Sequence, residues 1–466
     1  MASPASSESE LEAAFLRLKS AYRSEPYPAY EQRRQWLNSL ERLLSENEDS
    51  ICSAISADFG SRSRSEIQLA ELFTSSVEVR HCLRHLRSWM RPRRVSTPWY
   101  MLPARAYVIA QPVGVVGVIS PWNYPIFLSI PAAAGALAAG NRVLLKPSEM
   151  TPRTSELLQT LVARYFAPDV FTLVTGGPEI GKAVTRLPLD HLFFTGSTAV
   201  GREVARAAAE NLTPTTLELG GKSPAVLGRG ANLERAARSI VVSKLLNAGQ
   251  TCIAPDYCFV REEQVEEFTQ RLLRQERAMF SDEYTSIVSA RHFDRLQSML
   301  AEAVQAGARV LPSPPDSPET RSMPLKVVLN PPRDSRLMRE EIFGPILPIL
   351  TYRSIEEVVA HVSAGERPLA LYYMGSDSAE RRRLLHETVA GDVTVNDTLW
   401  HIAHPNLPFG GSGNSGQGAY HGEWSFRRFS HEKGVYQQSR WTAAPLLYPP
   451  FGKMFRATLG LLRRLH

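Results

Sequence analysis

The spacing of apolar and polar positions changes along the chain. Residues 8–95 carry apolar side chains at mixed intervals of three and four with charges between them, which predicts a run of helices. From about 107 to 220, short β-branched runs alternate with alanine-rich runs, and residues 222–400 repeat this alternation more loosely. Such alternation is typical of parallel, doubly wound sheets. The sequence therefore predicts an α/β fold with two doubly wound α/β domains.

The individual elements can be bounded from the same pattern. The predicted strands of the first region are 113–120, 142–146, 171–175 and 191–195. Its predicted helices are 131–140, 152–166, 178–187 and one that begins near Thr198. The second region has strand candidates at 224–228, 257–261 and 345–351. Residues 311–324 are rich in Pro and Ser and predict a loop.

Composition excludes several classes of protein. A chain of 466 residues with 43% hydrophobic and 21% charged residues is ordinary for a globular enzyme of two or three domains. The four cysteines are too few and too scattered for a disulfide framework, which favours a reducing, cytoplasmic setting. The acidic N-terminus has no apolar secretory segment, and prolines interrupt the longest apolar tract, 108–140. We therefore expect neither a secretory signal nor a membrane-spanning helix.

The net charge of +6 lies entirely in the C-terminal segment 433–466, which holds six Lys or Arg and no Asp or Glu. The neutral remainder argues against a nucleic-acid-binding protein. Residues 451–465 place apolar side chains on one helical face, namely Phe451, Met454, Phe455, Leu461, Leu462 and Leu465. The opposite arc is basic, with Lys453, Arg456, Arg463 and Arg464. This pattern predicts either peripheral contact with an anionic membrane or docking on protein, on the chain's own surface or on a partner subunit.

Three side chains are candidates for chemistry. A lone cysteine is usually an inert core residue, which is the interpretation we give to the cysteines other than Cys252. Cys252 stands in NAGQTCIAPDY, among small and flexible residues. Glu218 ends a predicted strand, where an apolar setting makes a carboxylate costly unless it is paired or serves as a base. Asn123, in SPWNYP, follows the end of a strand, where ligands bind in open α/β sheets.

Two glycine-containing motifs could bind a nucleotide. GSTAVG, residues 196–201, joins a predicted strand to a helix whose free N–H groups suit a phosphate, although an ordinary capped helix would look the same. The run from Gly411 to Gly416 matches G-x-G-x-x-G, but no strand–turn–helix unit surrounds it and the residues after it are poor helix formers. We interpret this second run as a glycine-rich loop.

Seven motifs in order resemble the aldehyde dehydrogenase superfamily across nearly the whole chain. They are SPWNYP, LLKPSE, FTGSTAVG, LELGGKSP, GQTCIAPDY, EEIFGPILP and LPFGG. The GQTCIAPDY, EEIFGPILP and YHGEWSFRRFSH forms resemble the class 3 branch. Within that branch, ISADFG and WMRPRRV most resemble bacterial coniferyl aldehyde dehydrogenases.

The resemblance implies a role for each catalytic candidate. Cys252 would be the nucleophile that attacks the aldehyde, and the Asn123 amide with the Cys252 N–H would hold the oxyanion. Glu218 would activate water to hydrolyse the thioester, whereas relatives that transfer the acyl group to coenzyme A generally lack this base. The implied product is a free carboxylic acid, from an aromatic aldehyde such as coniferyl aldehyde or from a medium-chain aliphatic one.

The resemblance also implies NAD as cofactor, with NADP as the alternative, and no metal. Lys146 and Glu149 would contact the adenosine ribose, where the glutamate would favour NAD by repelling an added phosphate. Class 3-like members nonetheless often accept both cofactors, so the preference stays open at this point. The implied contacts to the rest of the dinucleotide are Gly196, Ser197, Gly201, Glu341, Phe343 and Trp122. The aromatic neighbourhood of Trp122, Tyr124, Trp400 and His401 could line a substrate channel, or these residues could belong to the core or surface.

The implied organisation has four parts. Residues 1–90 and 116–221 would form the dinucleotide-binding domain, and 222–402 the catalytic domain. Residues 91–115 and 403–440 would bridge two subunits of a homodimer, with 441–466 as the basic tail. Two other functions stay open at this level. A cysteine acyltransferase would leave GSTAVG and KPSE without a purpose, and a non-enzymatic scaffold would not need both Cys252 and Glu218.

Overall fold

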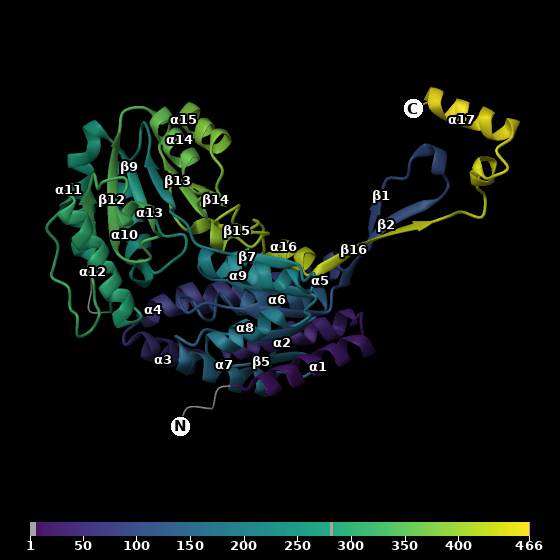
Figure 1. Ribbon diagram of the computed structural model, residues 1–466, viewed down its shortest axis with the longest axis horizontal. Coiled ribbons are helices and arrows are strands. Elements are labelled where there is room, and N and C mark those ends of the chain that lie inside the picture. The colour runs from purple at the N-terminus through teal and green to yellow at the C-terminus, as the bar shows by residue number, and fades with distance from the viewer. Residues whose placement is uncertain (1–5, 280–282, 466) are drawn as a thin grey trace.

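The computed structural model describes residues 6–279 and 283–465 (Figure 1). Residues 1–5 of the predicted dinucleotide-binding segment and residue 466 of the tail lie outside this description. The described chain contains a six-stranded, a seven-stranded and a three-stranded sheet. The two larger sheets are mostly parallel and are covered by helices, which confirms the predicted α/β class.

The six-stranded sheet has the order β15-β7-β6-β3-β4-β5, with only β15 antiparallel. Its strands are β3 (Val115–Ile119), β4 (Arg142–Lys146), β5 (Phe171–Leu173), β6 (His191–Thr195), β7 (Thr215–Glu218) and β15 (Gly416–Gln417). The helices connecting these strands are α6 (Ile130–Ala139), α7 (Pro152–Tyr165), α8 (Pro178–Arg186) and α9 (Thr198–Ala209). The N-terminal helical region comprises α1 (Glu8–Ser24), α2 (Tyr30–Ser45), α3 (Glu48–Phe59), α4 (Arg64–Ile67), the π-helical turn η1 (Gln68–Phe73) and α5 (Thr74–Trp89).

Both faces of this sheet are buried. Val116 and Val118 of β3 pack in one hydrophobic cluster with residues of α2, α5, α6 and α7. Val115 and Ile119, which point to the other face, pack with α1, α8 and α9. Alternate residues of one strand thus enter two separate cores, as a doubly wound sheet requires.

The seven-stranded sheet has the order β10-β11-β12-β9-β8-β13-β14, with only β10 antiparallel. Its strands are β8 (Pro224–Leu227), β9 (Tyr257–Arg261), β10 (Arg309–Val310), β11 (Lys326–Leu329), β12 (Ile346–Tyr352), β13 (Ala370–Met374) and β14 (Asp392–Val395). The helices of this region are α10 (Leu233–Leu245), α11 (Val265–Met279), α12 (Ala290–Gln305), α13 (Arg336–Arg339), α14 (Ile355–Ala364) and α15 (Ser378–Glu387).

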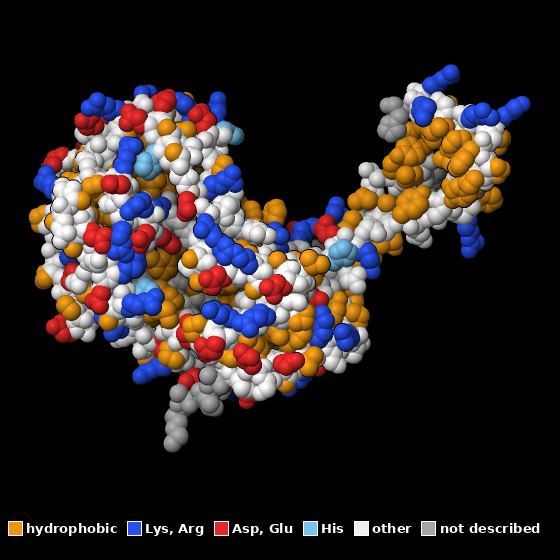
Figure 2. Space-filling model, viewed as in Figure 1, with side chains coloured by type: hydrophobic (Ala, Val, Ile, Leu, Met, Phe, Trp, Pro, Cys, Tyr) orange, Lys and Arg blue, Asp and Glu red, His pale blue; other side chains and the backbone are white. Residues whose placement is uncertain are grey.

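An arm projects from the body beside α5 and α16 (Gly422–Arg428) (Figure 1). We define the arm as the antiparallel sheet of β1 (Arg93–Val95), β2 (Arg105–Pro112) and β16 (Ser430–Gln437). Beyond it the tail, residues 441–465, ends in α17 (Lys453–Leu465), none of whose residues is buried. Figure 2 shows hydrophobic side chains gathered on this projecting part. No helix in residues 6–279 and 283–465 is long and apolar enough to cross a membrane.

Most element predictions agree with the structure, and two do not. The strands at 142–146, 191–195 and 257–261 are confirmed to the residue, 345–351 forms shifted by one residue, and the other predicted strands form with trimmed ends. The seven-stranded sheet contains four strands that were not predicted, β10, β11, β13 and β14. The residues after Gly416 were judged poor helix formers, which was wrong for 422–428, because α16 forms there by packing against α6.

Candidate active site

A cleft of about 230 Å³ is lined by residues at the carboxyl ends of the strands of the six-stranded sheet and by residues that precede strands of the seven-stranded sheet, at its amino ends. It brings together eight of the predicted site residues, namely Trp122, Asn123, Gly196, Ser197, Glu218, Cys252, Glu341 and Phe343. They come from the loops after β3, β6 and β7, the segment after α10, and the loop before β12. The carboxyl edge of parallel strands is where open α/β sheets bind ligands.

Cys252 lies in the cleft wall, after a segment of unusual backbone. Asn247, Ala248 and Gly249 have φ of 49°, 51° and 71°, in the left-handed region. A side chain at position 249 would stand 2.5 Å from the Gly344 carbonyl oxygen, so this position requires glycine. The backbone of the cysteine segment is therefore fixed by its surroundings rather than by local preference.

Burial raises the pKa of the Cys252 thiol well above its ordinary value, and the carboxyl groups of Glu341 and Glu218 raise it further. The backbone N–H groups of Cys252 and Ile253 act in the opposite direction by hydrogen bonding to the sulfur. The raised pKa favours the protonated thiol over the thiolate. The same N–H groups are suitable donors for an anion that forms next to the sulfur.

Asn123 is almost fully buried, and its loop is held at several points. Its side-chain Nδ2 donates to the Gln250 carbonyl at 3.1 Å. Its own carbonyl accepts from Asn247 Nδ2 at 2.9 Å and from Arg62 Nη1 at 3.1 Å. Because a primary amide carries two hydrogens, one N–H remains for a ligand in the cleft.

Glu218 ends β7, where it pairs with Thr195 of β6 on one side and Gly416 of β15 on the other. Both carboxyl oxygens are buried and accept no hydrogen bond from the residues that the structure describes. Burial raises the pKa of this carboxyl well above its usual range, and Asp392 raises it further, while Arg428 opposes the shift. A buried carboxyl without a partner costs stability, and such groups are concentrated at functional sites.

Glu341 and the aromatic rings beside it form another wall of the cleft. One buried oxygen of Glu341 has no partner within the described chain. Burial raises the pKa of Glu341 to about 8, and Asp256 adds to the rise. The rings of Trp122 and Phe343 lie edge to face with centroids 5.5 Å apart. A side chain at position 220 would stand 2.0 Å from a Glu341 oxygen, so Gly220 keeps this space open.

Ser197 caps α9, and its hydroxyl accepts from the Val200 N–H at 3.4 Å. This is the capped helix that the sequence left as an alternative to phosphate binding, and the two roles are compatible because other N–H groups remain free at a helix start. A side chain at Gly201 would meet Leu219 at 2.5 Å, so this glycine allows α9 to pack closely on the sheet.

Lys146, Glu149 and Gly201 do not line the cleft itself. Lys146 ends β4 and forms an ion pair with Glu149 at 2.7 Å. Its neighbour in the sheet is Ile119, which closes the strand leading to Asn123. The pair therefore lies on the same sheet edge as the cleft.

Further cleft residues escaped the sequence analysis, among them His292, Arg295, Phe409 and Tyr420. Phe409 and Tyr420 belong to motifs already singled out, LPFGG and YHGEWSF, and could have been found there. His292 and Arg295 project from α12, whose sequence gives only an amphipathic pattern. Of the proposed channel residues only Trp122 lines the cleft, since Tyr124 and His401 are buried elsewhere and Trp400 is exposed.

The glycine-rich run 411–416 does not line the cleft but pairs with the strand that carries Glu218. It forms a tight loop that leads into β15 and so places Gly416 beside Glu218. A side chain at Gly411 would meet the Ser415 carbonyl oxygen at 2.1 Å, which explains a glycine at that position. In the described residues, no group of three or more His, Cys, Asp or Glu is arranged to hold a metal ion.

Comparison with known proteins identifies the family. The aldehyde dehydrogenase family model matches residues 1–435. A protein named probable coniferyl aldehyde dehydrogenase from Pseudomonas aeruginosa is 46% identical over 449 residues, which are 95% of this chain and 94% of that protein.

Two solved structures have the same fold. A substrate-bound structure of AldH from Staphylococcus aureus has a TM-score of 0.93 at 34% identity and covers 97% of this chain and 99% of its own. An aldehyde dehydrogenase of Mycobacterium tuberculosis in complex with NAD+ has a TM-score of 0.86 at 27% identity and covers 95% of this chain and 92% of its own. The chain therefore belongs to the aldehyde dehydrogenase family and is an NAD(P)-dependent enzyme that oxidises an aldehyde to the carboxylic acid.

Proposed function

We propose that Cys252 is the nucleophile of this oxidation. The thiol loses its proton to solvent, the resulting thiolate sulfur bonds to the aldehyde carbon, and the carbonyl oxygen takes up the negative charge. The free N–H of the Asn123 amide and the backbone N–H of Cys252 stabilise that charge. The observation that carries this proposal is that the thiol, the amide and the unpartnered carboxyl of Glu218 line one cleft.

The residues around Glu341 fit a nicotinamide dinucleotide. Its unpartnered carboxyl oxygen can accept from ribose hydroxyls, and the rings of Phe343 and Trp122 offer flat surfaces to the nicotinamide. A bound dinucleotide would supply the acceptor for the hydride that leaves the former aldehyde carbon, which would remain on Cys252 as a thioester. Gly196 and Ser197 would face the pyrophosphate, and Gly201 allows the helix start to approach it.

Glu218 then acts as the base of hydrolysis. Its carboxylate takes a proton from water as the water oxygen bonds to the thioester carbon. The carbon–sulfur bond then breaks to release the acid, and the leaving sulfur takes the proton from Glu218 and becomes the thiol again. The raised pKa of Glu218 makes its carboxylate a stronger base than an exposed glutamate. Since a base of this kind is needed only when water is the acyl acceptor, its presence supports release of a free acid.

We propose NAD as the preferred cofactor, with NADP used less well. Lys146 and Glu149 would meet the adenosine ribose, and the carboxylate of Glu149, partly exposed and paired with Lys146, would repel a phosphate there. For the substrate we propose an aromatic aldehyde of the coniferyl type, with medium-chain aliphatic aldehydes as the second class. The aromatic lining of the cleft and the relationship to coniferyl aldehyde dehydrogenases support this choice.

A panel of coniferyl aldehyde, benzaldehyde and hexanal, each assayed with NAD and NADP, tests these assignments. We expect the largest kcat/KM for coniferyl aldehyde with NAD, and no acid formed by Cys252→Ala. Cys258→Ala is the matched control, because that thiol is buried outside the cleft. A preference for hexanal would overturn the substrate assignment, and acid formation by Cys252→Ala would overturn the mechanism.

We further propose that the enzyme is a homodimer joined through the arm, and that α17 attaches it reversibly to anionic membranes. Among the described residues the main packing of α17 is against its own preceding turn, η6 (Ala444–Leu447). None of α17 is buried, which favours an external surface over docking on the body. Co-sedimentation with phosphatidylserine vesicles should retain the full chain and lose a chain ending at Trp441. Equal partitioning of both would end this idea.

A further inference from the structure

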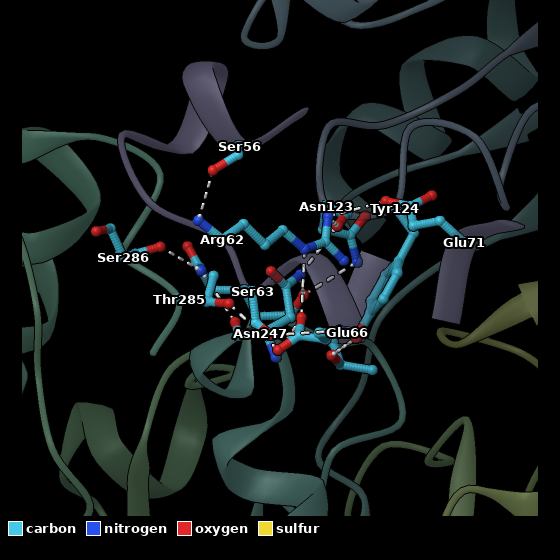
Figure 3. Close-up of polar contacts among 12 residues, drawn as sticks. Ser56, Arg62, Ser63, Glu66, Glu71, Asn123, Tyr124, Asn247, Thr285 and Ser286 are labelled. Atoms are coloured by element: carbon cyan, nitrogen blue, oxygen red, sulfur yellow. Dashed lines mark hydrogen bonds and ion pairs between the residues drawn. The ribbon is translucent and has the colours of Figure 1, made fainter. Parts of the chain in front are cut away.

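Arg62, Glu66 and Glu71 form a largely buried cluster of charges, which Figure 3 shows beside Asn123 and Asn247. None of these three charged residues lines the cleft. The Arg62 side chain is fully buried and forms ion pairs with Glu71 at 2.8 Å and with Glu66 at 3.2 Å. Its guanidinium also lies over the rings of Phe59 and Tyr124, with 4.9 Å and 4.8 Å to the centroids. The aromatic rings therefore contact the plane of the guanidinium, and the two carboxylates contact its N–H groups.

The cluster holds the loop that carries Asn123. Arg62 Nη1, which pairs with Glu71, also donates to the Asn123 carbonyl at 3.1 Å. The second oxygen of Glu71 accepts from the backbone N–H groups of Ile126 and Phe127, each at 2.9 Å. One ion pair therefore fixes both the start and the end of this loop.

The same cluster holds the segment that leads to Cys252. The Glu66 oxygen that pairs with Arg62 also accepts from the backbone N–H of Asn247 at 2.9 Å. Asn247 Nδ2 then donates to the carbonyls of Asn123 and Gln250, at 2.9 Å and 3.1 Å. That Gln250 oxygen is the one that holds the Asn123 side chain. The amide and the thiol loops are thus joined through one set of hydrogen bonds.

Stability alone does not explain this arrangement. Buried ion pairs gain little over well-packed apolar side chains of similar volume, because three charged groups must be desolvated. What the charges provide is geometry, since the guanidinium fork holds its acceptors in fixed directions. An amide that stabilises an oxyanion needs such fixed placement, because displacement by about 1 Å costs about 100-fold in rate.

We propose that Arg62 is a positioning residue that aims the Asn123 amide at the oxygen of the reacting aldehyde. It does so by holding the Asn123 carbonyl, with Glu71 and Glu66 fixing Arg62 in turn. The inference rests on the proposed role of Asn123 in the oxidation. Arg62 itself touches neither the cavity nor the reacting atoms.

A double-mutant cycle between Arg62→Lys and Asn123→Ala tests the proposal. Lysine keeps the positive charge but lacks the planar set of N–H donors that holds several acceptors at once, so we expect kcat to fall about 10- to 100-fold. The Kd for NAD, measured by fluorescence titration, should stay unchanged. Asn123→Ala alone should lower kcat about 100- to 1000-fold. In the Asn123→Ala background, Arg62→Lys should have less than about a twofold further effect, because the amide that it positions is gone.

Arg33→Lys is the matched control. Arg33 is another fully buried arginine, but it donates to the carbonyls of Pro28 and Ala139, and none of these three residues lines the cleft. We expect Arg33→Lys to keep wild-type kcat. If Arg62→Lys does not fold, Glu71→Gln replaces it in the test. The glutamine keeps one oxygen that can accept a hydrogen bond, but it loses the charge that forms the ion pair with Arg62.

The outcomes distinguish a failure of the positioning role of Arg62 from a failure of the donor role of Asn123. Multiplicative effects of Arg62→Lys and Asn123→Ala, or an equal loss in Arg33→Lys, would overturn the positioning role and leave Asn123 as oxyanion donor. Full activity of Asn123→Ala would overturn that donor role and the inference with it. A kcat loss in Arg62→Lys that disappears without the Asn123 amide supports the proposal.

Discussion

Replacing Glu218 with glutamine separates the two halves of the reaction. Glutamine has the same shape, and neither oxygen of Glu218 accepts a hydrogen bond from the described chain, so the substitution breaks no contact. It also removes a buried carboxyl without a partner, which should not lower stability. General bases contribute about 10²- to 10⁴-fold, or about 3 to 5 kcal/mol of barrier, and this loss should fall on hydrolysis alone.

Rapid mixing of Glu218→Gln with aldehyde and NAD should therefore give a stoichiometric burst of NADH followed by a steady rate about 10²- to 10⁴-fold below wild type. The wild-type steady rate should rise with pH as Glu218 ionises, with a midpoint above that of an ordinary glutamate, because burial raises its pKa. The variant should lose this rise.

Glu276→Gln is the matched control, because Glu276 is also buried with an unpartnered oxygen and a raised pKa but lies on α11, outside the cleft. We expect it to turn over like wild type. A burst that disappears together with steady turnover would show that Glu218 acts before the thioester forms. Wild-type turnover in Glu218→Gln would refute its role as base.

Three further predictions concern other carboxyl groups. In Glu341→Gln the midpoint of Cys252 alkylation by iodoacetamide should move to lower pH, because a carboxylate that raises the thiol pKa is gone; an unchanged midpoint would contradict this. Glu149→Gln should raise the NADP/NAD ratio of kcat/KM roughly 10-fold by removing a charge near the added phosphate, and steady-state assays with both cofactors would detect a failure to do so. Burial raises the pKa of Glu78 from 4.5 to about 7. Ionisation of this carboxyl therefore lowers the free energy of unfolding by about 3 kcal/mol as the pH rises from the ordinary pKa to the raised one. Urea unfolding should therefore find Glu78→Gln more stable than wild type at pH 8 and nearly equal to it at pH 4.5, and an equal gain at both values would disprove the linkage.

The first large sheet could be predicted nearly in full, and the second only in part. RVLLK lies between Asn141 and Pro147 and HLFFT between Asp190 and Gly196, so turn-forming residues make the limits of β4 and β6 visible in the sequence. β13, with the sequence ALYYM, is buried on both faces and therefore lacks the alternation that marks a strand. β14 has four residues and no apolar run, so only its pairing with β13 defines it.

The site shows the same division. Cys252, Glu218 and Asn123 stand in motifs whose order along the chain could be recognised. Arg62 and Glu71 could not be found in this way, since in the sequence they are two charges in a helical region rich in charges. Their importance comes from a contact with Asn123, 61 positions along the chain, and local pattern carries no information on such pairs.

Residues 420–437 run from the cleft to the projecting arm. Tyr420 lines the cavity, α16 follows at once, and β16 starts at Ser430 and runs out along β2. Because Ser425 of α16 fits against Gly135 of α6, the junction is anchored and cannot slide freely. A chain that ends at Phe429 would lose β16 but keep Tyr420 in the lining of the cleft. A chain that ends before Tyr420 would lose this lining residue. Engineers who wish to trim this enzyme thus have a natural stopping point only nine residues beyond the cavity.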